Sequence, residues 1–137
     1  MRIATVGALV IGILCVAAPV WAHHSFAAEY DVNKPLTLKG TITKIEFVNP
    51  HAWLYMDVKD PNGKVANWAV EMGTPNGLIR RGFTKASVPV GTVVTVDGYA
   101  AKDGSTTANG TTIKLPDGTQ LFAGSTAPGA PGGEPPK

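Results

Sequence analysis

Cysteine is nearly absent from this sequence: the only one in 137 residues is Cys15, within an apolar run near the N-terminus. A single cysteine excludes an internal disulfide, and its loss with a cleaved leader would also exclude a thiolate metal site or a cysteine nucleophile. An excess of charge of one sign is lacking too, since 12 basic and 10 acidic residues give a formal net charge of +2. These scattered charges provide no electrostatic footprint for nucleic acid or for an anionic membrane.

Several catalytic signatures are missing as well. The sequence contains no nucleophile elbow of a hydrolase, no redox CxxC, no haem-binding CxxCH and no glycine-rich phosphate loop. The acidic residues Glu46, Asp57, Glu71 and Asp97 fall on different predicted strands, with no pairing that indicates acid–base catalysis. We therefore predict that the protein is not an enzyme.

Residues 1–22 have the pattern of a signal peptide. Arg2 provides a minimal positive region, an apolar run follows, and Val20-Trp21-Ala22 places small residues around a cleavage site. A membrane anchor is the alternative, because the run is near the lower length limit for a spanning helix. Cleavage would leave residues 23–137 with no remaining membrane segment. Export without disulfides favours the bacterial periplasm, or secretion, as the location.

The remaining sequence is dominated by alternating runs typical of β-strands. Asn49-Pro50 separates the first two runs and predicts a bend, Gly40 predicts a bulge or barrel corner, and Asn62-Gly63 predicts a tight hairpin. The predicted strands are Leu36–Glu46, Ala52–Val58, Val65–Met72, Thr92–Ala101, Thr111–Leu115 and Thr119–Phe122.

One short helix is predicted between the third and fourth strands, over Asn76–Arg81, with Thr74 as its N-cap and Gly82 as its stop. This order favours a mainly all-β fold: a five- to six-stranded OB-like Greek-key barrel. A flattened sandwich is the alternative. The predicted organisation is an extended lead-in over 23–35, the barrel over 36–123 and a disordered Gly/Pro-rich tail over 124–137.

Four motifs in the sequence are similar to those of a known family. They are HHSFAAEYD, GTITKIEFVNPHAWLYMDVKD, EMGTPNGLIRRGF and VGTVVTVDGYAAKDGS, and the resemblance that rests on them runs from His23 to about Gly124. Together they resemble a family of small exported bacterial proteins of unknown function, the uncharacterised DUF6152-like domain. The resemblance implies an exported location and a barrel-like β domain. It implies no established reaction and no catalytic residues.

The most specific candidate site is a copper site at the N-terminus that signal-peptide cleavage would create. Cleavage after Ala22 would give His23 a free α-amine beside its imidazole, and His51 would supply a third nitrogen. Such a nitrogen set suits copper. His24 is an alternative to either histidine, and zinc would need a further ligand, such as Glu29, Asp31 or water. The competing interpretation is structural, with two surface histidines and a turn histidine bonded to a carbonyl.

A second candidate is an aromatic binding face. Trp53 and Tyr55 share one face of the second predicted strand, where they would either stack on a ligand or fill the core. Trp68 is expected in the core. Arg80 and Arg81 would either bind an anion or complement the dipole of the short helix.

From these observations we predict an exported β-barrel module that binds a small ligand or an exported partner protein, with copper as the candidate cofactor. The first alternative is an accessory or assembly protein that contacts another exported protein through its aromatic face. The second alternative is a copper-dependent redox enzyme.

Overall fold

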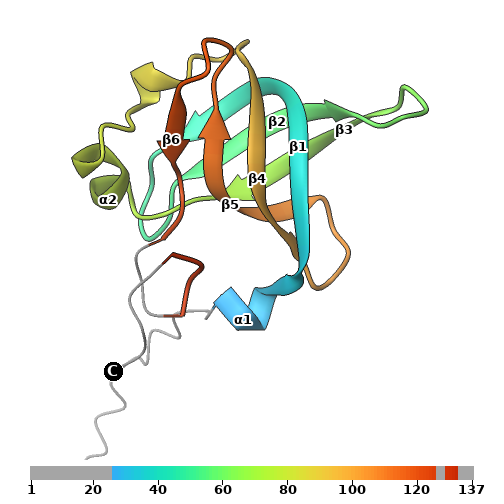
Figure 1. The fold of residues 1–137 in the computed structure, drawn as a ribbon, viewed down its shortest axis with the longest axis horizontal. Helices are drawn as coiled ribbons and strands as arrows, with labels where there is room; N and C mark the ends of the chain where they lie inside the picture. The colour runs from blue at the N-terminus through green and yellow to red at the C-terminus, as the bar shows by residue number, and fades with distance from the viewer. Residues whose placement is uncertain (1–25, 126–128, 133–137) are drawn as a thin grey trace, which may run out of the picture.

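The computed structural model describes residues 26–125 and 129–132 (Figure 1). The predicted leader, His23 and His24 lie outside these residues. The described elements are α1 (Phe26–Glu29), β1 (Tyr30–Glu46), β2 (Trp53–Lys59), β3 (Val65–Glu71), α2 (Pro75–Arg80), a 3-10 turn (Lys85–Ser87), β4 (Val93–Ala101), β5 (Thr107–Lys114) and β6 (Gln120–Phe122). In this part of the chain, no helix is long and apolar enough to cross a membrane.

The strands form one six-stranded sheet in the order β3-β2-β1-β4-β5-β6, and a further pairing between β3 and β5 closes it. This closing pair is parallel and joins Ala69 to Thr107 and Glu71 to Asn109, whereas the other neighbouring strands are antiparallel. Five strands thus make a ring, with β6 outside it. The structure confirms the predicted mainly-β, OB-like barrel, and the closed ring excludes the flattened sandwich.

Gly40 forms the corner at which β1 passes from one neighbour to the other. It is paired with Val94 of β4 and also with Val58 of β2. A Cβ atom at Gly40 would lie 2.2 Å from the Asp57 carbonyl oxygen, so only glycine allows the strands to approach this closely. The corner predicted at this glycine is confirmed.

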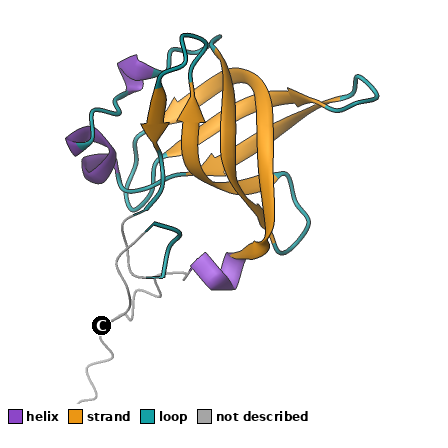
Figure 2. Cartoon of the chain, viewed as in Figure 1, coloured by secondary structure: helices purple, strands orange, loops and turns teal. Residues whose placement is uncertain are grey.

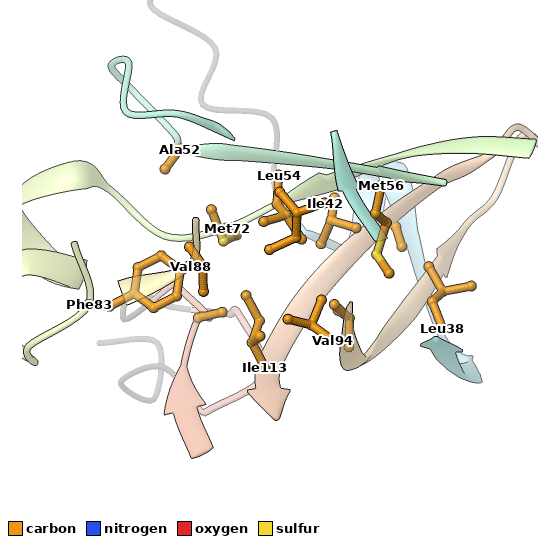
Figure 3. Packing of buried hydrophobic residues seen from close by; sticks show 14 of the residues in the cluster. Leu38, Ile42, Ala52, Leu54, Met56, Met72, Phe83, Val88, Val94 and Ile113 are labelled. Atoms are coloured by element: carbon orange, nitrogen blue, oxygen red, sulfur yellow. The ribbon is translucent and has the colours of Figure 1, made fainter. Parts of the chain in front are cut away.

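The interior of the barrel is filled by the apolar side of each strand. Leu54 and Met56 of β2 are fully buried, whereas Trp53 and Tyr55, on the opposite face, are only partly covered. Figure 3 shows Leu54 and Met56 among the side chains that meet across the barrel. The buried hydrophobic cluster consists of Leu38, Ile42, Ala52, Leu54, Met56, Val70, Met72, Leu78, Phe83, Val88, Val94, Val96, Ala108, Ile113 and Ala123.

The helix predicted between the third and fourth strands is α2, which lies beside the barrel in Figure 2. Its N-cap is Thr74, whose hydroxyl accepts a hydrogen bond of 3.1 Å from the Gly77 amide. Leu78 and Phe83 are fully buried, and the Phe83 ring stacks on Phe47 at 5.9 Å between centroids. This segment therefore joins the hydrophobic core as well as connecting two strands.

Two strands are longer than the sequence pattern predicts. β1 begins at Tyr30 instead of Leu36, and β5 begins at Thr107 instead of Thr111. The added part of β1 is mostly polar and exposed, so it lacks the alternation that marks a half-buried strand.

After β6, Ala123 accepts a hydrogen bond of 2.8 Å from the Gly73 amide, and Gly124 and Ser125 are buried.

Candidate functional site

His51 lies in the connection between β1 and β2, which is held against the end of β3. Ala52 exchanges two backbone hydrogen bonds of 2.9 Å with Met72 and Gly73. The Asn49-Pro50 peptide that precedes this contact is cis. The Nδ1 atom of His51 is 3.1 Å from the Met72 carbonyl oxygen. Because a carbonyl only accepts, Nδ1 carries the hydrogen and Nε2 is the nitrogen left for another partner.

Glu71, the last residue of β3, faces this nitrogen. Its Oε1 atom is 3.7 Å from His51 Nε2, and the two side chains are 13% and 26% exposed. The separation is too long for a hydrogen bond. The other carboxylate oxygen accepts a hydrogen bond of 2.7 Å from the Tyr30 hydroxyl. Three elements distant in the sequence thus bring an imidazole, a carboxylate and a phenol together.

Tyr30 is the buried member of this group, with 3% of its surface exposed. Burial raises its pKa well above the ordinary value, and the hydrogen bond to Glu71 and the negative charge of that carboxylate raise the pKa further. The phenol is therefore a neutral hydrogen-bond donor at physiological pH, and it holds Glu71 Oε2 in one position.

The short helix α1 is anchored to the same end of the barrel. The Phe26 ring stacks on Tyr30 at 5.7 Å and meets Tyr99 edge-on at 5.6 Å, both between centroids. Lys102 adds two hydrogen bonds, from its amide to the Glu29 carbonyl at 2.8 Å and from Nζ to the Ala27 carbonyl at 2.5 Å. These contacts hold α1, with which the described chain begins, against this end of the barrel.

Trp53 lies beside this group, directly across from Glu71 in the β2–β3 pairing. A groove of about 310 Å³ runs past it, bounded also by Tyr30 and by the connection between β4 and β5, including Asp103 and Ser105. Tyr55 does not line the groove. Its hydroxyl donates to Glu46 at 3.2 Å, and Lys44 lies over its ring. Of the two predicted ligand-binding aromatics, Trp53 therefore lines this groove and Tyr55 does not.

Arg80 and Arg81 are both exposed at the C-terminal end of α2. The Arg81 guanidinium lies 4.1 Å from the centroid of the Phe122 ring, an arrangement typical of a cation–π contact. Trp68, which was expected in the core, is only partly buried and packs against the hydrophobic cluster from its edge.

Sequence reasoning missed the roles of Glu71 and Tyr30 in this group. Glu71 is separated from both His51 and Tyr30 along the chain, and only the strand pairing and the β1–β2 connection bring them together. Among the described residues, no group of three or more His, Cys, Asp and Glu side chains is placed to hold a metal ion. The described part of the chain supplies two neighbouring donors, His51 Nε2 and Glu71 Oε1.

Residues 10–111 match the model of a protein family described as a family of unknown function, DUF6152. Neither curated proteins nor solved structures gave a significant match to this chain.

Proposed function

The chain belongs to the DUF6152 family, to which no function is assigned, and we propose that it is an exported, non-enzymatic β-barrel module that binds copper at its mature N-terminus. The ligands are the α-amine and imidazole of His23 and the Nε2 atom of His51. The observation that carries this proposal is the hydrogen bond between His51 Nδ1 and the Met72 carbonyl, because it leaves Nε2, which faces Glu71 Oε1 at 3.7 Å, as the ring nitrogen that could bind a metal.

The anchoring of α1 supports the proposal. Phe26 is packed on Tyr30, and the Tyr30 hydroxyl binds Glu71, which in turn faces His51. His23 is three residues before Phe26. With cleavage after Ala22, a tether of three residues, which spans at most about 10 Å, would separate the terminal amine from Phe26. A short tether lowers the entropy cost of bringing the amine and imidazole of His23 to His51.

The chemistry of the donors supports copper over other metals. One amine and two imidazoles make a set of three nitrogens, and tetragonal nitrogen coordination is typical of Cu(II). Hard ions such as Mg²⁺ and Ca²⁺ prefer oxygen donors and would not be held by such a set.

The proposal is tested by titrating Cu(II) into protein that was exported and processed in a bacterial host, with the mature N-terminus identified by mass spectrometry. We expect one-to-one binding in competition with a chelator. The comparison protein carries Ala-Pro before His23, since the proline lacks an amide hydrogen and the new terminus cannot form a substitute chelate. We expect this extension to abolish tight binding and His51→Ala to weaken it.

His24→Ala separates the two possible N-terminal histidines. Unchanged affinity assigns the imidazole ligand to His23, whereas a large loss assigns it to His24. Equal and weak copper binding by the processed and the extended protein would disprove the proposal, as would a mature N-terminus at another residue.

The groove beside Trp53 favours a second candidate function, the binding of a small ligand or of an exported partner protein at the aromatic face. Trp53 offers a half-covered ring next to hydrogen-bonding groups such as Ser105, a combination common in ligand sites. Trp53→Ala would abolish capture of such a ligand from periplasmic extract. Tyr55→Ala, two residues along the same face but outside the groove, is the matched control and would leave capture unchanged.

A further inference from the structure

We propose that the groove beside Trp53 binds a small organic cation that carries a quaternary ammonium group. The inference rests on the second candidate function, the binding of a small ligand at this groove, and it names the chemical class of that ligand. It does not depend on the copper proposal, because His51, the copper ligand in the described part of the chain, does not line the groove.

Two aromatic side chains line the groove, Trp53 of β2 and Tyr30 at the start of β1. Trp53 is partly covered, whereas Tyr30 is buried, with Phe26 stacked on its ring at 5.7 Å between centroids. Aromatic rings attract cations through the negative charge of their faces, tryptophan most strongly, and quaternary ammonium sites are built from such rings. This wall of the groove therefore suits a cation with an apolar surface.

The charged groups along the groove are mainly acidic. Glu29 and Asp103 line it, and Lys102 is the one basic residue among the described residues that do so. The Lys102 ammonium donates a hydrogen bond of 2.5 Å to the Ala27 carbonyl, which holds this positive charge against α1. The balance of charge disfavours an anionic ligand such as a phosphate ester and favours a cation.

The pKa of Tyr30 reflects the same negative potential. Burial is the main cause that raises this pKa, and the negative charges of Glu71, Glu29 and Asp103 raise it further. These carboxylates come from three separate segments, the end of β3, α1 and the connection between β4 and β5. A potential that disfavours a phenolate at the wall of the groove stabilises a positive charge within it.

The size and polar groups of the groove favour a small, methylated ammonium over a primary amine. Asp103 Oδ1 already accepts a hydrogen bond of 2.9 Å from the Ser105 amide. A primary ammonium is strongly hydrated and has three donors to satisfy on binding, whereas the methyl groups of a quaternary ammonium require no hydrogen bonds. The groove of about 310 Å³ is near the lower end of the range for ligand sites, roughly 300–1,000 Å³.

The test compares two probes of the same shape, choline and its neutral isostere dimethylbutanol, in which a carbon atom replaces the charged nitrogen. Each is titrated into the full-length, processed protein, and binding is followed by the NMR chemical shifts of the backbone amides, which also locate the site. A metal chelator is present throughout, so that the result is separate from copper binding.

Two substitutions in the groove have matched controls outside it. Trp53→Leu removes the ring and keeps an apolar side chain, and Tyr55→Leu does the same on the same strand face beside the groove. Asp103→Asn removes one charge, and its control is Asp117→Asn at the other end of β5. Asp117 accepts a hydrogen bond of 2.8 Å from the Thr119 amide, the same local contact that Asp103 makes. Thermal unfolding establishes that each variant is folded.

We expect saturable one-to-one binding of choline with shifts confined to the groove, and binding of the isostere weaker by about tenfold or more. Trp53→Leu should weaken choline binding by about fivefold or more. Asp103→Asn should weaken it by about threefold, since the lost attraction is that of one exposed charge. Both control variants should bind choline with the affinity of the wild type.

Equal binding of choline and its isostere would overturn the inference, because the groove would then recognise apolar shape without charge. A lack of saturable choline binding would overturn it too, as would losses in the control variants equal to those in the groove variants. Capture of an uncharged or anionic ligand from periplasmic extract, dependent on Trp53, would show that this inference is wrong and that the second candidate function stands. If neither choline binding nor such capture occurs, both are wrong.

Discussion

The hydroxyl of Tyr30, the first residue of β1, donates a hydrogen bond of 2.7 Å to the carboxylate of Glu71, the last residue of β3, 41 positions further along the chain. Strands β1 and β3 are not neighbours in the sheet, since β2 lies between them. This one contact therefore ties the N-terminal segment to the edge of β3 at which the barrel closes onto β5.

Replacement of Tyr30 by phenylalanine should lower the free energy of unfolding. The variant keeps the buried ring and removes a hydrogen bond to a charged acceptor, a loss that costs about 1.5–3 kcal/mol. Urea unfolding at neutral pH measures the difference. Tyr99→Phe is the control, because Tyr99 also packs on Phe26 through its ring. A difference for Tyr30→Phe no larger than that for Tyr99→Phe would contradict the importance of the hydroxyl.

The raised pKa of Tyr30 predicts a loss of stability at alkaline pH. In the unfolded chain the phenol releases its proton near its ordinary pKa of 10.0, whereas in the folded protein burial and Glu71 retain the proton. Above pH 10 the folded state thus binds more protons than the unfolded state, and stability falls by about 1.4 kcal/mol per pH unit for each such group.

The measurement is urea unfolding between pH 9 and pH 11.5 (a range set by the ordinary pKa of 10.0) for the wild type and Tyr30→Phe. The free energy of unfolding should fall more steeply with pH for the wild type than for Tyr30→Phe. The difference in slope should correspond to the release of roughly one additional proton on unfolding. Parallel curves for the two proteins would show that Tyr30 titrates alike in the folded and unfolded states.

Asp97 of β4 should stabilise the protein in a pH-dependent way. Its carboxylate binds Lys114 of β5 at 2.9 Å and accepts a hydrogen bond of 2.8 Å from Thr37 of β1. Lys114 first, and then Thr37, lower its pKa below the ordinary 3.8, so the contribution is present above that pH and is lost as pH falls through the folded-state pKa.

Because the two side chains of the ion pair are 34% and 44% exposed, we expect Asp97→Asn to cost only about 0.5–1 kcal/mol at pH 6. The cost should shrink below pH 3.8. A double-mutant cycle with Lys114→Met isolates the ion pair from other effects of each substitution. A cost that stays constant between pH 6 and pH 2.5 would contradict the assigned origin.

Gly98 should tolerate no side chain. A Cβ atom at this position would lie 2.0 Å from the Asn109 carbonyl oxygen, which belongs to the backbone of the neighbouring strand and cannot move aside as a side chain does. We expect Gly98→Ala to cost about 3 kcal/mol or more by separating β4 from β5. Thermal unfolding followed by circular dichroism measures this loss, and a stability within about 0.5 kcal/mol of the wild type would disprove the close approach.

The local features of the fold were predictable because each depends on neighbouring residues. Alternation placed Leu54 and Met56 on one face of the strand and Trp53 on the other, and Thr74 marked the start of the helix. The structure decided that the face with Leu54 and Met56 is the buried one. Gly40 marked the corner of β1 because a strand glycine allows another strand to approach closely. These are periodicity and steric rules that act over a few residues.

The start of β1 at Tyr30 could not be predicted in this way. Apart from the exposed Val32, residues 31–35 are polar or proline, and β1 pairs with β4 here through Tyr30 and Pro35, on either side of an irregularity in the register. Backbone pairing carries no periodic signal when both faces are exposed. The start of β5 pairs with β3 in parallel, and it lacks a periodic signal for another reason: its first residues are small or polar, and the consecutive residues Ala108 and Asn109 are both buried.

By itself, the sequence determined the class of fold, the corner at Gly40 and the choice of His51 as a candidate site residue. Strand periodicity, glycine sterics and a rare residue type, the three signals behind these conclusions, can all be recognised locally. Only the tertiary structure decided that Glu71 and Tyr30 belong beside His51. Closure of the ring and the docking of α1 bring these residues together from three separate segments, and long-range proximity of this kind leaves no trace in local sequence patterns.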